Sequence, residues 1–353
     1  MSIKNWNAGI IRPVPVAPTG PYQDGAAPGV WTLDQVAYWQ KQGLWPIAGN
    51  TPPDALFFGG SDNISTLNVI QRISIASTGN ATDFGDLSAA NIYFGSCSSA
   101  TRGLTGGGGG YGQGGLIYYV TIATAGNAQS FGNLTVSRNS LTAFSNSTRG
   151  VFAGGAVEGT NSPSNTLDYV TIASVGNATD FGDLTTSGSA NGGVRSTPAA
   201  CSSTTRGIVA GGDMGVAGAT NVIQYVTIAS TGNATDFGDL NAITYEFCGF
   251  SSATRGCFAG GNAAGARSNT IQYITIASAG NATDFGDLIV TTSELSGTSN
   301  SVRGVIGGGA ITGNVTNVIQ YVTIASTGDA IDFGDLFIKS SGLAACSSTH
   351  GGL

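Results

Sequence analysis

The chain has 353 residues, of which 56 are glycine and only 9% are charged. Thirteen basic and twenty acidic residues give a net charge of −7, so a basic nucleic-acid-binding surface is excluded. Lys, Arg and Glu are scarce and apolar runs are short, which predicts a helix-poor folded protein without membrane insertion.

The chemistry-bearing residues point away from catalysis. The single histidine, His350, lies near the end, and the five cysteines show no paired spacing. The chain therefore lacks the residues from which most hydrolase triads and zinc sites are built. We therefore expect no enzyme activity, no cofactor and no metal site.

Residues 1–54 differ in composition from the rest and are predicted to form an extended N-terminal arm. All four tryptophans, Trp6, Trp31, Trp39 and Trp45, and eight of the ten prolines fall there. The proline-rich stretch 11–29 favours an extended chain, whereas residues 32–44 can form a short helix with Thr32 as its N-cap. The arm must bury its tryptophans either on its own downstream domain or on a partner, and we favour the partner.

Residues 55–353 consist of repeats. A 14-residue core, TIASTGNATDFGDL at 227–240, recurs six times, with starts at 74, 121, 171, 227, 275 and 323. A second motif, SSATRG and its variants, runs in step with it and contains Arg102, Arg149, Arg206, Arg255 and Arg303. A period near 50 residues indicates a repeated supersecondary unit.

Each unit contains four strand signals. In chain order they are a run of small residues such as 342–348, a strand ending in Gly-Gly such as 150–155, a β-branched strand such as 222–230, and a fourth strand such as 236–240. Four strands in each of six units predict an all-β fold, a six-bladed β-propeller.

The unit resembles a kelch repeat. The resemblance rests on the double glycine, the following strand tyrosine (Tyr169, Tyr225, Tyr273, Tyr321) and an aromatic residue about a dozen positions later. That aromatic residue is usually Trp in kelch proteins, whereas this chain has phenylalanine at Phe84, Phe131, Phe181, Phe237, Phe285 and Phe333. We therefore expect a kelch-like branch rather than a typical kelch protein.

The phase of the repeats predicts how the fold closes. The first unit starts at its second strand, at Ala55, and the chain ends just after an additional first strand, 343–348. Pairing of these two segments would complete the split blade and remove both open edges.

Several repeated residues have a structural and a functional interpretation. The Asp-Phe-Gly tripeptides lack the other kinase motifs and are read as structural. Their aspartates could bind calcium, but we favour turn formation. For the repeated arginines we favour pairing with aspartates over a sialidase-like cluster. Cys97, Cys201 and Cys346 are expected to be buried and inert.

The connections between strands predict a binding face. Two of the connections are nearly identical in every unit, whereas those at the opposite end differ from unit to unit. Because varied loops usually mediate recognition, we expect residues 107–115, 156–165 and 185–200 to be the most exposed part of a binding face.

The repeated ATDFGDL and the phrase APGVWTLDQVAYWQKQGLWP at 27–46 resemble virion structural proteins of bacteriophages, especially those of cyanobacteria and other aquatic bacteria. The resemblance implies a virion location, with residues 1–54 bound to other virion proteins and the propeller displayed. A tail fibre or adaptor that contacts a host surface ligand through the variable loops, a head or neck decoration protein, and a bacterial surface adhesin remain the alternatives. A homo-oligomer is compatible with each.

Overall fold

The computed structural model describes residues 32, 34, 35, 38, 54–110, 112–185, 197–214, 218–263 and 265–353. The chain divides into two units, Met1–Pro53 and Asp54–Leu353. Within residues 54–353 the described chain contains strands and turns without helix, so the prediction of an all-β fold is confirmed for this unit.

In the first unit, the described residues include the predicted helix start. Asp34, Gln35 and Tyr38 are helical. The Gln35 N–H donates to Thr32 Oγ1 (3.3 Å), and the Thr32 N–H donates to Gln35 Oε1 (2.9 Å). This reciprocal pair is a capping box, and it confirms Thr32 as the N-cap.

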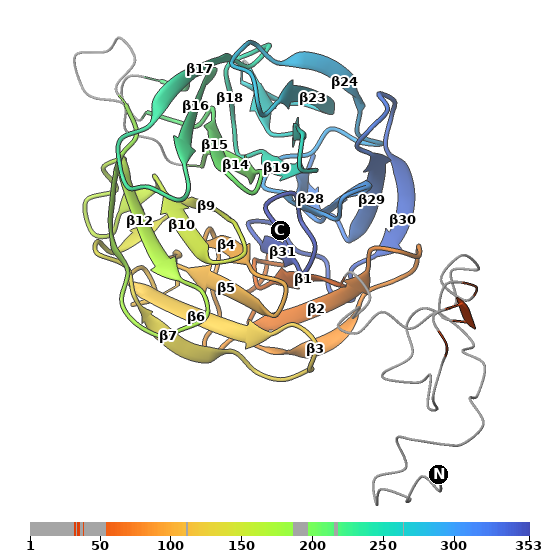
Figure 1. Ribbon diagram of the computed structural model, residues 1–353, viewed down its shortest axis with the longest axis horizontal. Helices are drawn as coiled ribbons and strands as arrows, with labels where there is room; N and C mark the ends of the chain where they lie inside the picture. The colour runs from red at the N-terminus through yellow and green to blue at the C-terminus, as the bar shows by residue number, and fades with distance from the viewer. Residues whose placement is uncertain are drawn as a thin grey trace, which may run out of the picture. The chain divides into compact units, whose positions relative to one another are not determined.

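The described residues of the second unit form six four-stranded antiparallel sheets, arranged around a common centre in Figure 1. The innermost strands of the first to sixth sheets are β31 (Ala344–Ser347), β4 (Gly95–Ser98), β9 (Thr142–Ser145), β14 (Ala199–Ser202), β19 (Cys248–Ser251) and β25 (Ser296–Ser299). The second strands are β1 (Asp54–Phe58), β5 (Arg102–Gly106), β10 (Arg149–Ala153), β15 (Arg206–Ala210), β20 (Arg255–Ala259) and β26 (Arg303–Gly307).

The outer half of each sheet is formed by the β-branched strand and the Asp-Phe-Gly strand. The third strands are β2 (Val69–Ser74), β6 (Leu116–Thr121), β12 (Thr166–Thr171), β16 (Val222–Thr227), β23 (Thr270–Thr275) and β29 (Val318–Thr323). The outermost strands are β3 (Thr82–Asp86), β7 (Gln129–Asn133), β13 (Thr179–Asp183), β17 (Thr235–Asp239), β24 (Thr283–Asp287) and β30 (Ile331–Asp335).

The structure contains the predicted pairing between the strand that includes Ala55 and the C-terminal segment 343–348. β31 pairs antiparallel with β1, and Ala55 lies opposite Ser347. The first and last described strands therefore lie in the same sheet, and their pairing leaves no open edge between them.

The innermost strands are joined by a closed ring of serine hydrogen bonds. The hydroxyl of each serine donates to the backbone carbonyl of the equivalent serine in the preceding sheet, at 2.5–2.8 Å. The six serines are Ser98, Ser145, Ser202, Ser251, Ser299 and Ser347. Only small side chains fit this crowded centre, which explains the small residues of the innermost strands.

Hydrophobic packing lies between neighbouring sheets. Each of the six core clusters takes its buried residues from two adjacent sheets, and the cluster of Phe57, Ile75, Val305 and Phe333 joins the sixth sheet to the first. Burial of both sheet faces accounts for the low charge content, because few positions outside the loops face water.

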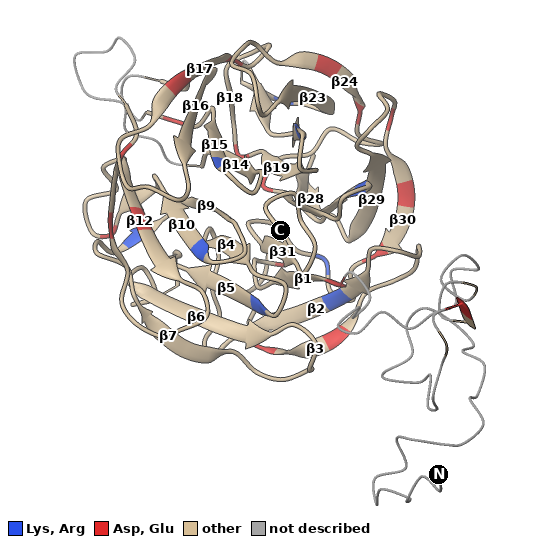
Figure 2. Cartoon of the chain, viewed as in Figure 1, with Lys and Arg blue, Asp and Glu red and all other residues tan. Residues whose placement is uncertain are grey.

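The repeated Gly-Asn-Ala turn connects each sheet to the preceding one. In the fifth sheet, the Gly280 and Ala282 N–H groups donate to the Phe237 and Asp239 carbonyls, and Asn281 Oδ1 accepts from the Asp239 N–H (3.0 Å). The same contacts recur in each of the six sheets, including Asn80 to Asp335 across the chain ends. The aspartates thus lie in outermost strands, visible as acidic positions in Figure 2, rather than in the turns that we predicted.

The predicted pairing of the repeated arginines with aspartates is wrong. Arg102, the first of the series, lies over the Tyr119 ring (4.8 Å) and donates to the Ile172 and Ala173 carbonyls of the next sheet. The other four arginines lie over tyrosine rings at 4.3–4.8 Å and also donate to a carbonyl of the next sheet. Backbone carbonyls are the acceptors because the aspartates are in the outermost strands, whereas each arginine begins a second strand.

Candidate functional site

The antiparallel order gives the sheets two different ends. One end, called the uniform end, carries the SSATRG-type turns and the Gly-Asn-Ala turns. The other, called the varied end, carries the Gly-Gly connections and the linkers between sheets. At the varied end the described chain forms extra short strands, namely β8 (Arg138–Asn139), β11 (Ala156–Val157), β18 (Thr244–Tyr245), β21 (Asn262–Ala263), β22 (Ala266–Arg267), β27 (Ala310–Ile311) and β28 (Asn314–Val315).

The three loops that were predicted to be most exposed differ from one another in how exposed they are in the structure. Residues 158–162 are exposed, in agreement with the prediction. In the stretch 107–115, Gly107, Gly108 and Gly114 are buried. Residues 186–196 lie outside the described part of the chain, and Ala199 and Ala200 belong to β14, so the predicted loop 185–200 extends too far.

The residues singled out from the sequence fall into three groups. Trp6, Trp31, Trp39 and Trp45, expected to anchor the arm, lie outside the described residues. The repeat phenylalanines are buried, and Phe131, Phe181, Phe237, Phe285 and Phe333 meet the tyrosine of their own sheet edge to face. They are therefore core residues.

The cysteines also belong to the core. Cys97, Cys201 and Cys346 are buried as expected, and burial raises the pKa of each thiol. A thiol held in its neutral form is a weak nucleophile, which agrees with the inert role predicted for these residues.

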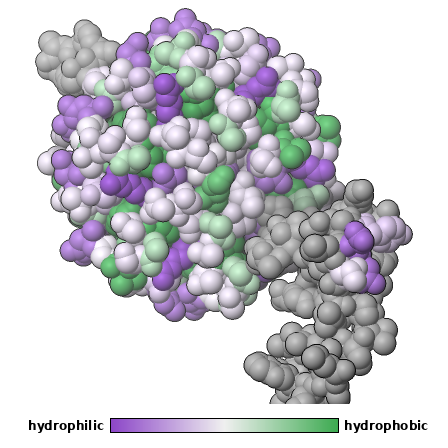
Figure 3. All heavy atoms as spheres, in the orientation of Figure 1, coloured by the Kyte–Doolittle hydropathy of each residue, from purple (hydrophilic) through white to green (hydrophobic). Residues whose placement is uncertain are grey.

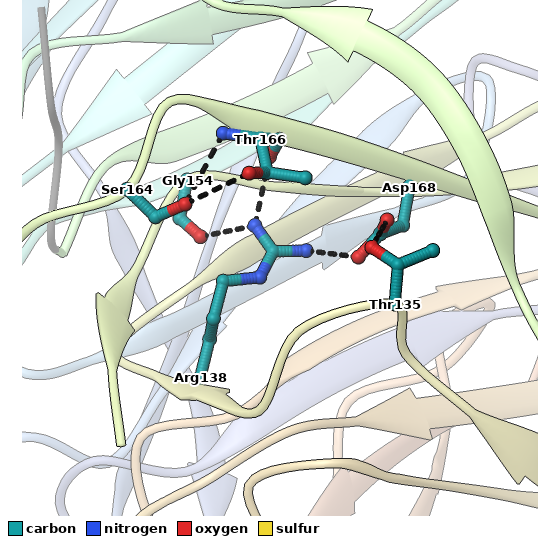
Figure 4. A network of polar contacts seen from close by, with 6 residues as sticks. All are labelled: Thr135, Arg138, Gly154, Ser164, Thr166 and Asp168. Carbon is teal, nitrogen blue, oxygen red and sulfur yellow. Dashed lines mark hydrogen bonds and ion pairs between the residues drawn. The ribbon is translucent and has the colours of Figure 1, made fainter. Parts of the chain in front are cut away.

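A buried polar network supports the varied end between the second and third sheets (Figure 4). Arg138 forms an ion pair with Asp168, and both side chains are fully buried. The guanidinium also donates to the Gly154 and Thr166 carbonyls, while the Thr135 hydroxyl donates to Asp168. The network thus ties Arg138 of the linker 134–141 to the second and third strands of the third sheet.

Three cavities follow the centre of the second unit from end to end. The one nearest the uniform end has a volume of about 50 Å³ and is bounded by the serine ring and His350. The middle cavity, of about 110 Å³, is lined by innermost strands. The third, of about 80 Å³, opens at the varied end and is called the axial cavity below.

The last residues of the chain occupy the centre at the uniform end, where Figure 1 marks the C-terminus. The Gly351 N–H donates to the Ser251 carbonyl, and His350 Nε2 lies 3.1 Å from the Ser98 carbonyl and 3.2 Å from Ser145 Oγ. Burial lowers the pKa of His350 to about 4, so the ring is neutral near pH 7.

The rim of the axial cavity is built from one residue of each linker. These residues are Tyr93, Ser140, Thr197, Glu246, Glu294 and Gly342, and their backbone N–H and C=O groups form a closed ring of hydrogen bonds at 2.6–3.2 Å. All six have φ between 53° and 65°, in the left-handed region. Only one is glycine, so the other five hold an uncommon conformation that costs about 1–3 kcal/mol each.

The polar groups of the rim are incompletely paired. Glu246 accepts a hydrogen bond from Asn262 (2.5 Å), and Glu294 accepts one from Ser341 (3.0 Å). Burial and the neighbouring Glu294 raise the pKa of Glu246, and the Thr197 hydroxyl oxygen is buried without a partner. Sequence reasoning missed this cluster because its members have no common residue type.

Below the rim the axial cavity has an apolar floor. It consists of the residue that follows each rim position, namely Phe94, Leu141, Pro198, Phe247, Leu295 and Leu343. On the face shown in Figure 3, hydrophobic and hydrophilic residues alternate over the second unit without one large apolar patch. A hollow with a polar rim and an apolar floor is typical of a small-ligand site.

Comparisons with known proteins do not identify the chain. No protein-family model matches it, and no curated protein matches it significantly. Among the described residues, no helix is long and apolar enough to cross a membrane.

Proposed function

We propose that the six sheets are the blades of a kelch-like β-propeller that belongs to a bacteriophage virion structural protein. The serine ring, the six inter-sheet cores and the pairing of β1 with β31 support the propeller assignment. The phrase at 27–46 and the ATDFGDL repeats support the virion assignment through their resemblance to phage structural proteins.

The position of Asp54 carries the proposal for how the protein is displayed. Asp54 begins β1 beside Ser348, whose N–H donates to its carbonyl (3.1 Å), so the N-terminal unit joins the sheets at the uniform end. The varied connections lie at the opposite end. We propose that the arm binds the virion and that the varied connections, which lie at the end opposite its attachment point, contact a host surface ligand as those of a tail fibre or adaptor would.

Purified particles test this proposal. We expect the protein to be detected by mass spectrometry in a few copies per virion, and a label inserted at 158–162 to be seen by cryo-electron microscopy at the tail. Hundreds of copies on the capsid would support the head-decoration alternative. Absence from particles, with the protein on the bacterial surface, would support the adhesin alternative and overturn the virion assignment.

Loop exchange tests which face binds. Replacing residues 158–162 with the equivalent connection of another sheet is expected to reduce adsorption to host cells while particle assembly stays normal. The matched control exchanges a uniform-end turn, 230–233, for 278–281, which has nearly the same sequence. Unaltered adsorption of the loop variant would contradict a receptor role for this part of the varied end.

A further inference from the structure

Residues 349–353, called the plug below, close the centre of the second unit at the uniform end. The Gly351 N–H donates to the Ser251 carbonyl (3.1 Å), and the Leu353 N–H donates to the His350 carbonyl (3.0 Å). Neither contact belongs to a sheet, because the last strand, β31, ends at Ser347. The plug is therefore held by a few contacts of its own, and it can leave the centre while the sheets stay paired.

The plug fits the centre closely. A Cβ on Gly351 would lie 2.3 Å from the Ser252 carbonyl oxygen, and a Cβ on Gly352 would lie 2.0 Å from the Ser145 carbonyl oxygen. Because both distances are far shorter than a van der Waals contact, the plug reaches this place only with glycine at the two positions. The cavity of about 50 Å³ behind it is bounded by the serine ring and His350.

The His350 ring has hydrogen-bond partners at both nitrogens, and they fix its neutral form. Nδ1 accepts a hydrogen bond from the Gly352 N–H (3.1 Å), so the ring proton is on Nε2. Nε2 lies 3.1 Å from the Ser98 carbonyl oxygen and 3.2 Å from Ser145 Oγ, both of which can accept that proton. A second proton, on Nδ1, would face the Gly352 N–H, and two donors cannot pair.

The cavity offers no negative charge to a protonated His350. The other titratable residues that line it are Cys97, Cys201 and Cys346. Burial raises the pKa of each thiol, so all three are neutral at pH 7 and below. The repeated arginines of the uniform end lie over tyrosine rings and carry the same sign of charge as a protonated imidazole.

The neighbouring chain offers no counter-charge either. Asp54 contacts this segment through its backbone carbonyl, which accepts from the Ser348 N–H, whereas its carboxylate forms an ion pair with Arg72. Among the described residues His350 forms no ion pair, and this includes the carboxylate of Leu353. A protonated His350 would therefore be an uncompensated charge, which is unfavourable at this site.

We propose that the plug is a pH-sensitive closure of the centre, which protonation of His350 releases. In the neutral form, the imidazole holds Gly352 through Nδ1 and the serine ring through Nε2. Protonation replaces the first contact with two opposed donors and adds a charge without a partner, so the plug leaves and the serine ring becomes accessible from the uniform end. This closure does not depend on a virion location.

Amide hydrogen exchange of the full chain tests the closure. Since the pKa of His350 falls from 6.5 to about 4 when the plug is in place, the open fraction should rise by up to about a hundredfold between pH 7 and 4. The protection of the amides of 350–353, corrected for the intrinsic exchange rate at each pH, should fall by the same factor. The amides of β16 are the internal reference and are expected to keep their protection.

Three variants separate release of the plug from unfolding. His350→Gln keeps a donor and an acceptor but does not titrate, so its plug should be equally protected at pH 7 and 4. Gly352→Ala should leave the plug unprotected at both pH values while β16 stays protected. Gly280→Ala is the matched control, because its Cβ would meet open space at the same end, and its plug should behave as in the wild type.

The proposal is overturned if the plug of the wild type is equally protected at pH 7 and 4. It is also overturned if His350→Gln loses this protection as the wild type does, or if β16 of the wild type loses its protection together with the plug. His350 is the single histidine of the chain, so one imidazole signal in proton NMR reports its titration. That titration is expected in the pH range in which the plug loses its protection, and a titration outside that range would also overturn the proposal.

Discussion

At the scale of single residues, the glycine of the outermost strand allows close approach of the next sheet. A Cβ on Gly132, in the outermost strand of the second sheet, would lie 2.1 Å from the Gly176 carbonyl oxygen of the next sheet. Gly176, on the other side of the same contact, has open space where its Cβ would be. The Phe-Gly of the repeat therefore lets the next turn dock on the strand.

Gly132→Ala is expected to reduce the free energy of unfolding by about 2–3 kcal/mol, because backbone atoms must move to admit the methyl group. Gly176→Ala is the matched control and should change it by less than about 0.5 kcal/mol. Urea denaturation of both variants measures the difference. Equal losses would show that backbone conformation, and not contact between sheets, requires the glycine.

His350 is expected to make stability depend on pH in one window. Its pKa is lowered in the folded state to about 4, so the unfolded chain takes up the proton first, and stability is lost as the pH falls from the ordinary value of 6.5 toward 4. Free energies of unfolding between pH 7 and 4 should fall more steeply for the wild type than for His350→Gln. Parallel curves would show that the ring is not held neutral.

At the scale of elements, the first sheet departs from the other five. Asp54 stands at the register position that Arg102 has in the second sheet, and Arg72 stands where Tyr119 does. Asp54 and Arg72 form an ion pair (2.6 Å), so the contact between the first and second sheets lacks the arginine bridge found at the other five. Burial raises the pKa of Asp54 despite Arg72, which marks this pair as incompletely compensated.

The double variant Asp54→Arg/Arg72→Tyr is expected to install the sixth bridge, with the Ile122 and Ala123 carbonyls as acceptors. Asp54→Arg alone places two arginines together and should be destabilising. A double-mutant cycle measured by chemical denaturation should give a favourable coupling of about 1–2 kcal/mol. An additive cycle would contradict the equivalence of the six positions.

Sequence periodicity predicted most of the strands in each sheet, but it did not predict the axial cavity. Strand signals such as 222–230 were found because alternation within a strand is local, and β16 ends at Thr227 where the turn begins. The rim was not foreseen, because Tyr93, Glu246 and Glu294 share only a backbone conformation and a place in the linkers. The sequence analysis also missed the hydrogen-bond acceptors of the arginines, because every residue has a backbone carbonyl and the residue type does not indicate which carbonyl accepts.

At the scale of the whole molecule, several independent sets of contacts connect all six sheets, and two of them include a residue of the C-terminal segment that contains β31. The serine ring passes through Ser347, and the rim passes through Gly342. We expect the second unit to unfold cooperatively, because unfolding of any one sheet breaks its contacts with both neighbouring sheets.

Deletion of residues 341–353 is expected to leave β1 with an open edge, to lower the melting temperature and to cause self-association through that edge. Deletion of 349–353 is the control, because it keeps β31 and removes only the residues at the centre. Melting curves and analytical ultracentrifugation measure both effects. A 341–353 deletion that stays monomeric with an unchanged melting temperature would contradict closure through β31.

The sequence alone determined the four-strand unit, the six repeats and the segments that pair in the first sheet, because these depend on local alternation and on the order of motifs along the chain. Tertiary structure decided what fills the spaces between sheets: which carbonyl each arginine meets, where His350 lies, and which six linker residues surround the axial cavity. Those groups are about 50 or more residues apart in the chain, so only the arrangement of the sheets brings them together.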